Sequence, residues 1–240
     1  MAKRLILLAH GAGGASNHPW MDKWAKLLEP LGRVVRFDYP FAQKNKELDA
    51  KTKEAAAANG DAPEEDEGAE NANGHGRRRQ GQKRHQPDPL KALIQAHRNA
   101  IDDAKKDGDK VVLIGKSMGG RVSCHVSLED GVAVDGIVCL GYPLQAQGRR
   151  VKGTRDEVLR ELRSPVMFVQ GTRDRMCPIR SLDEIRQDID VPNYIHVVEG
   201  GDHSLIVRKT QLDELGKKQE DLDRAAVDAI KAFLDKHVPV

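Results

Sequence analysis

One serine lies in a glycine-rich window directly after a short apolar run. The run is Val111–Ile114, and the window Gly115–Gly119 reads Gly-Lys-Ser-Met-Gly, with Ser117 at its centre. A serine on a sharp turn between a strand and a helix can present its hydroxyl as a nucleophile, and the flanking glycines remove side chains that would clash across the turn. The simpler alternative is a glycine-rich turn with an incidental serine. The position after an apolar run favours the nucleophile.

An acid and a histidine follow this serine in the chain. Asp174 comes just after the apolar run Pro165–Gln170, and His203 comes just after the run Tyr194–Val198. Taken alone, each could be an ordinary turn or structural residue, but a serine, an acid and a histidine in this order are typical of one class of catalytic triad. Asp202 is an alternative acid. It is adjacent to His203, and neighbouring side chains diverge, so the sequence favours Asp174.

A second glycine-rich segment, His10–Gly14, closes the first apolar run, Leu5–Ala9. A backbone N–H from such a loop, together with the N–H that follows the nucleophile, can stabilise the oxyanion of an acyl-transfer reaction. This reasoning assigns Ala12 and Met118 as the two donors. The alternative is a tight turn into a helix near Trp20–Leu28.

These polar residues all follow short apolar runs that alternate with helical patterns. Further runs lie at 33–37 and 134–140, and helical spacing appears at 90–104, 119–128 and 221–238. Unbroken apolar strands are buried on both faces, and their alternation with helices predicts an α/β fold with a mostly parallel central sheet and helices on both faces. In such sheets the chemistry lies beyond the carboxyl ends of the strands. Only about twenty residues, 143–163, are available for a lid, so the lid is minimal and the site is open.

Composition sets the class of protein. The chain has 240 residues, with 39 Lys and Arg against 37 Asp and Glu, which predicts a single domain over 1–240 and argues against a generally basic nucleic-acid binder. No apolar run is long enough for a signal peptide or a membrane span. The three cysteines and nine histidines show no disulfide or metal-ligand spacing. We therefore expect a cytoplasmic protein with no metal, no cofactor and no membrane partner.

The segment 43–86 differs from the rest of the chain. Its only large apolar side chain is Leu48, its part 61–70 has six acidic residues, and its part 77–84 has five basic residues. Such a low-complexity stretch buries too little apolar surface to offset its ordering entropy, so we expect an insertion that is mostly disordered. The basic tract permits a nuclear address, nucleic-acid contact or a protein partner, and the simpler alternative is a solvated tether.

The motifs together resemble one group of α/β-hydrolases. The chain is similar to the testis-expressed protein thirty group and to the hydrolase-like region of a subunit of the nuclear NSL acetyltransferase complex, and more distantly to dienelactone-hydrolase-like proteins. The resemblance is strongest to plant and green-algal members. It rests on the segments 10–13, 20–21, 37–40, 115–123, 139–144, 168–171 and 200–204.

The resemblance implies the α/β-hydrolase fold. Combined with the motifs, it predicts a serine hydrolase that cleaves a small-molecule ester or thioester with Ser117, His203 and Asp174. The alternative is a catalytically quiet interaction module on a hydrolase scaffold, in the nucleus, and the intact set of three residues argues against it.

Overall fold

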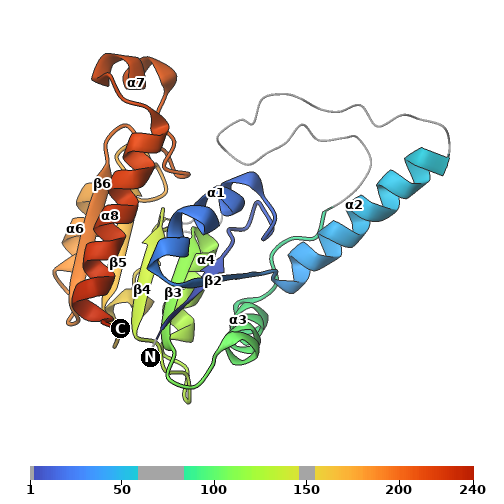
Figure 1. The fold of residues 1–240 in the computed structure, drawn as a ribbon, viewed down its shortest axis with the longest axis horizontal. Coiled ribbons are helices and arrows are strands. Elements are labelled where there is room, and N and C mark those ends of the chain that lie inside the picture. Colours follow the sequence, from blue (N-terminus) through green and yellow to red (C-terminus); the bar gives the residue numbers. More distant parts are fainter. Residues whose placement is uncertain (1–2, 59–83, 146–154) are drawn as a thin grey trace.

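Six parallel strands form one sheet through the middle of the protein (Figure 1). The computed structural model of the chain describes residues 3–58, 84–145 and 155–240. The strands are β1 (Arg4–Ala9), β2 (Arg33–Phe37), β3 (Lys110–Lys116), β4 (Gly136–Leu140), β5 (Val166–Gly171) and β6 (Asn193–Val198). Their order across the sheet is β2-β1-β3-β4-β5-β6, and every pairing is parallel. Each strand falls on a predicted apolar run, so the predicted fold class is confirmed.

Helices cover both faces of the sheet. The helices are α1 (Pro19–Leu28), the 3-10 helix η1 (Glu29–Leu31), α2 (Pro40–Ala58), α3 (Leu90–Ala104), α4 (Met118–Val126), α5 (Glu157–Arg160), α6 (Ile179–Arg186), α7 (Lys209–Leu215) and α8 (Gln219–His237). Alternate side chains of a strand point to opposite faces. In β1, Ile6 and Leu8 therefore pack with α1 and α8, and Leu5 and Leu7 pack with α3 and α4. Every residue of β1, β4 and β5 is buried. Each fully buried Leu or Ile contributes about 2 kcal/mol, so these strands form a rigid frame for the loops at their ends.

Helix α2 projects away from the sheet (Figure 1). It occupies 43–58 of the segment that we expected to be mostly disordered, so that expectation differs from the structure over this part. Residues 59–83 of the segment lie outside the described residues. The physical reason for the helix is local, because alanines and long unbranched side chains have high helix propensity even where little apolar surface is buried.

The chain returns from the insertion alongside the first turns of α2. Three contacts join the two segments: Asn45 with His85 (2.8 and 3.1 Å), Asp49 with Arg84 (2.9 and 3.0 Å), and Phe41 with Asp88 (2.7 Å). We call this set of contacts the neck of the insertion. It holds the outgoing and returning chain together close to the sheet.

Among the described residues, no helix combines the length and the apolar character that crossing a bilayer requires.

Candidate active site

Ser117 lies on the turn between β3 and α4. Its backbone has φ 50° and ψ −115°, outside the regions that non-glycine residues usually occupy, and its N–H donates to the carbonyl of Leu140 (3.0 Å). The turn is also crowded. A Cβ atom on Gly115 would lie 2.2 Å from the nitrogen of Gly120, and one on Gly119 would lie 2.5 Å from the carbonyl oxygen of Ala9. Only glycine fits at these two positions, which explains the spacing of the motif.

The structure brings the three predicted residues together. The Nε2 atom of His203 lies 2.7 Å from the Oγ atom of Ser117, and its Nδ1 atom lies 2.7 Å from Oδ2 of Asp174. An ionised carboxylate only accepts hydrogen bonds, so Nδ1 carries the proton and donates it to Asp174. Nε2 is then free to accept the hydroxyl hydrogen of Ser117. This arrangement can withdraw a proton from the serine as the oxygen attacks an electrophile.

Asp174 is held by a network that the sequence did not reveal. Besides His203, its carboxylate accepts hydrogen bonds from Nε2 of Gln170 (2.6 Å) and from the N–H of Met176 (2.8 Å). Gln170 in turn accepts a hydrogen bond from the N–H of Tyr142 at its Oε1 atom (3.0 Å). Both Asp174 and Gln170 are buried. The available signal was a glutamine near the end of an otherwise apolar, buried strand.

Asp202, the alternative acid, does not contact the His203 ring in the way Asp174 does but binds the backbone of its own turn. Its Oδ1 atom accepts hydrogen bonds from the N–H groups of Ser204 (2.8 Å) and Ile206 (3.0 Å). These bonds shape the turn that follows β6, on which His203 lies. The structure therefore directs Asp202 to the backbone of the turn and Asp174 to the imidazole ring.

The two predicted backbone donors, Ala12 and Met118, lie on segments that adjoin Ser117. Met118 follows it as the first residue of α4, where backbone N–H groups have no partner within the helix. Ala12 follows Gly11, which packs against the serine: a Cβ atom on Gly11 would lie 3.5 Å from Cβ of Ser117. Within the described part of the chain, neither the Ala12 nor the Met118 N–H has a hydrogen-bond partner. Both amides are thus available to a ligand oxygen.

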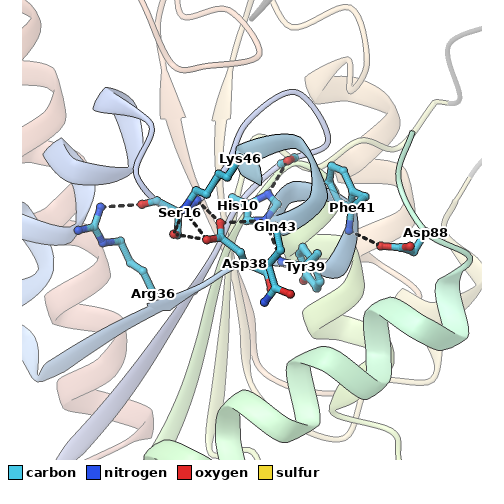
Figure 2. Close-up of polar contacts among 10 residues, drawn as sticks. His10, Ser16, Arg36, Asp38, Tyr39, Phe41, Gln43, Lys46 and Asp88 are labelled. Carbon is cyan, nitrogen blue, oxygen red and sulfur yellow. Dashed lines mark hydrogen bonds and ion pairs between the residues drawn. The ribbon is translucent and has the colours of Figure 1, made fainter. Parts of the chain in front are cut away.

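His10 shapes the loop that carries Ala12 (Figure 2). Its Nδ1 atom donates to the carbonyl of Gly11 (2.8 Å), and its Nε2 atom accepts a hydrogen bond from the N–H of Tyr39 (3.2 Å). Burial lowers the pKa of His10 below its ordinary value. The ring is therefore neutral near pH 7, which is the state that both hydrogen bonds require.

Trp20, in α1, contacts both sides of the site. Its Nε1 atom donates to the carbonyl of Ser204, the residue after His203 (2.9 Å), and its ring lies 4.6 Å from the Nζ atom of Lys116, the residue before Ser117. A cation over a tryptophan ring is stabilised by the ring quadrupole. The structure thus directs the Lys116 ammonium group onto this ring.

Among the described residues, no three His, Cys, Asp or Glu side chains are grouped in a way that could hold a metal ion. Cys124, Cys139 and Cys177 are free and buried.

Comparison with known proteins agrees with this fold. A family model described as "Alpha/beta hydrolase domain" matches residues 2–59 and 75–235. Dienelactone hydrolase from Anabaena variabilis is similar in structure, with 15% sequence identity, a TM-score of 0.62, and coverage of 98% of this chain and 87% of that chain. A monoacylglycerol lipase from Paleococcus ferrophilus has 14% identity and a TM-score of 0.58, with 97% of each chain covered. Est1E from Butyrivibrio proteoclasticus has 13% identity and a TM-score of 0.55, with coverage of 95% of this chain and 89% of that chain. At these identities the likeness concerns the fold.

Proposed function

The chain belongs to the α/β hydrolase family, and we propose that it is a serine hydrolase that cleaves an ester or a thioester of a small molecule. The observation that carries the proposal is the hydrogen-bonded chain from Ser117 through His203 to Asp174, with both distances at 2.7 Å. A serine hydroxyl is a weak nucleophile at its free pKa, and an adjacent base oriented by a third group is the usual means of activating it.

The proposed reaction has two acyl-transfer steps. In the first, the Ser117 oxygen attacks the carbonyl carbon while His203 takes the hydroxyl proton, and His203 then returns that proton to the leaving alcohol or thiol. In the second, His203 takes a proton from water, the hydroxide oxygen attacks the acyl-enzyme, and the carboxylic acid leaves as Ser117 regains its hydrogen. Asp174 holds the productive tautomer and stabilises the imidazolium that forms in each step. This scheme calls on no metal and no cofactor.

The amides of Ala12 and Met118 complete the proposed chemistry. In each step a negative charge develops on the carbonyl oxygen, and two fixed N–H donors stabilise it. One such donor contributes about 3 kcal/mol to the transition state. The free amide of Met118 at the start of α4 also lies where the helix dipole favours a negative charge.

We also propose the narrower kinship with the testis-expressed protein thirty group, in its plant and green-algal form, because the motifs around residues 10–13, 115–123 and 200–204 carry it. A cytoplasmic location belongs to the same proposal. The competing function is a catalytically quiet interaction module on the hydrolase scaffold, with a protein partner or a nuclear address at the charged insertion. The projecting helix α2 is the feature that favours this second function.

A fluorophosphonate probe separates the two functions, because it reacts covalently only with an activated serine. We expect the probe to label the wild-type protein at Ser117. The Ser117→Ala variant should not label, whereas Ser181→Ala, a change in α6, should label like the wild type. The labelled peptide is identified by mass spectrometry, and circular dichroism checks folding. A folded wild-type protein that takes up no label would favour the interaction module.

A further inference from the structure

The loop that carries Ala12 has no regular secondary structure between β1 and α1. A backbone N–H stabilises a developing oxyanion only when its direction is fixed before the reaction, because reorganising it during the reaction would consume the benefit. Two sets of contacts fix this loop. The first is the ring of His10 at its start, which lies between the carbonyl of Gly11 and the N–H of Tyr39. The second is at Ser16, near its end.

Charged side chains hold all three polar groups of Ser16 (Figure 2). Its N–H and its hydroxyl both donate to the carboxylate of Asp38, at 2.6 and 2.9 Å. Its hydroxyl oxygen accepts a hydrogen bond from Nζ of Lys46 (3.1 Å), and its carbonyl accepts one from Arg36 (2.7 Å). A loop residue with every polar group bound by side chains has little freedom to move. We call Ser16, Asp38 and Lys46 the loop clamp.

Asp38 and Lys46 also bind each other, which makes the clamp mutually supporting. The Nζ atom of Lys46 lies 2.5 Å from Oδ2 of Asp38, and the exposed fractions of the two side chains are 35% and 13%. Burial by itself raises the pKa of Asp38, but the hydrogen bonds from Lys46 and Ser16 outweigh it and hold that pKa below its ordinary value. Asp38 is therefore ionised at neutral pH and attracts the ammonium group of Lys46.

The clamp joins two parts of the molecule that the sequence separates. Asp38 follows β2, at the same edge of the sheet as the serine turn, and Lys46 lies in the first turns of α2. The projecting helix thus reaches Ser16 of the active-site loop through the ammonium group of Lys46 (Figure 2).

We infer that Lys46 and Asp38 are positioning residues for the proposed hydrolysis, which hold Ser16 so that the Ala12 N–H faces the developing oxyanion. This inference rests on the proposed function. Without the ammonium group the loop samples other conformations, and only the fraction with Ala12 in place is competent. The transition state then loses part of a donor, while a small ester still binds, so kcat falls and KM stays. The loss of one complete oxyanion donor lowers kcat by about 10²–10³, which sets the upper limit.

The test compares three substitutions on one helix. Lys46→Met removes the charge and keeps the length of the side chain, Lys46→Arg restores a cationic donor, and Lys44→Met changes an exposed lysine one half-turn away. With p-nitrophenyl acetate we expect Lys46→Met to lower kcat by about tenfold or more within that limit, with KM unchanged. Lys46→Arg should recover most of the loss, and Lys44→Met should behave as the wild type. A merely structural role would not produce a change confined to kcat that a cationic donor rescues.

Amide hydrogen exchange of the peptide spanning 10–18 gives a readout that does not depend on activity. We expect faster exchange there in Lys46→Met and in Asp38→Asn, and wild-type exchange in Lys44→Met. If Ser117→Ala abolishes hydrolysis but Lys46→Met and Asp38→Asn keep wild-type kcat, the inference is overturned while the proposed function stands. If the wild type hydrolyses no ester, the proposed function fails. Independently of activity, unchanged exchange in both Lys46→Met and Asp38→Asn would show that the clamp does not hold the loop, and this would overturn the inference.

Discussion

Replacing Asp174 with asparagine tests the polarity of the hydrogen-bond network around the proposed acid. All three groups that contact the carboxylate are donors: Nδ1 of His203, Nε2 of Gln170 and the N–H of Met176. The Met176 N–H is a backbone donor and cannot become an acceptor. Gln170 cannot turn its amide over without opposing the N–H of Tyr142, which its Oε1 atom now accepts. An asparagine offers one oxygen and one NH₂ group, so it must place a donor against a donor.

The magnitude follows from the two orientations that the asparagine can take. If its oxygen faces Met176, its NH₂ group faces Nδ1 of His203 and favours the tautomer protonated at Nε2. That ring cannot take the proton of Ser117, and kcat should fall by about 10⁴, equivalent to about 5 kcal/mol in the activation free energy. If the oxygen faces His203 instead, the partly buried Met176 N–H is left without an acceptor, which lowers the free energy of unfolding by about 1 kcal/mol.

Kinetics with p-nitrophenyl acetate and urea unfolding measure both outcomes in one set of variants. Asp202→Asn is the matched control, because its Oδ1 atom alone accepts the bonds from Ser204 and Ile206, and an amide oxygen can replace it. We expect less than a tenfold loss of kcat for this control. If Asp174→Asn were as active and as stable as the wild type, or if Asp202→Asn were the more damaging change, the assignment of Asp174 would be refuted.

Three further predictions concern stability, and the last of them also concerns activity. Burial lowers the pKa of His97 from 6.5 to about 3, so below pH 6.5 the unfolded chain binds a proton that the folded chain does not. Between pH 8 and pH 5 this difference lowers the free energy of unfolding by about 2 kcal/mol. Urea unfolding of His97→Leu at the two pH values should lack this contribution. If the variant and the wild type lost the same free energy of unfolding between the two pH values, the reasoning would be wrong. Gln170→Leu removes a donor from Asp174 and an acceptor from Tyr142, so it should lower the free energy of unfolding by about 3 kcal/mol, and unchanged urea unfolding would show that the network relaxes. The third change replaces residues 53–83 with a Gly/Ser linker of about six residues, which spans up to about 20 Å and leaves the neck in place. The melting temperature and kcat should change little. A large fall in the melting temperature would show that the segment packs on the domain, and a large fall in kcat alone would show that it acts as a lid.

The centre of the sheet could be predicted from the sequence because β1, β4 and β5 are buried at every position. The run Leu5–Ala9 has apolar side chains at every position, and β1 is buried at every position. The positions of Ser117, Asp174 and His203 at strand ends followed from the same pattern, since parallel strands bring their carboxyl ends to one edge.

The supporting residues could not be found in this way, because the pattern of apolar runs does not show which polar side chains turn toward each other. Lys46 lies in a stretch with hardly any apolar residues, and the turn from β2 into α2 brings it to Asp38, 8 residues away, and to Ser16, 30 residues away. Gln170 is one polar residue in an apolar run, and its role depends on the turn that places Asp174 four residues later. The helix α2 itself was obscured by composition, since charge and low hydrophobicity predict disorder while alanine favours a helix.

The strand order also determines how the insertion affects the folding rate. β1 pairs with β3, so Arg4 must meet Lys110 across roughly 100 residues of chain, and the whole insertion lies inside this loop. Closure entropy grows only with the logarithm of loop length, so the roughly 25 residues of 59–83 add about 0.2 kcal/mol to closing it. That amount slows the pairing of the two central strands by less than about twofold. A long polar segment can therefore lie between the first two strands and the rest of the sheet with almost no kinetic penalty, and a change in its length should alter the folding rate only slightly.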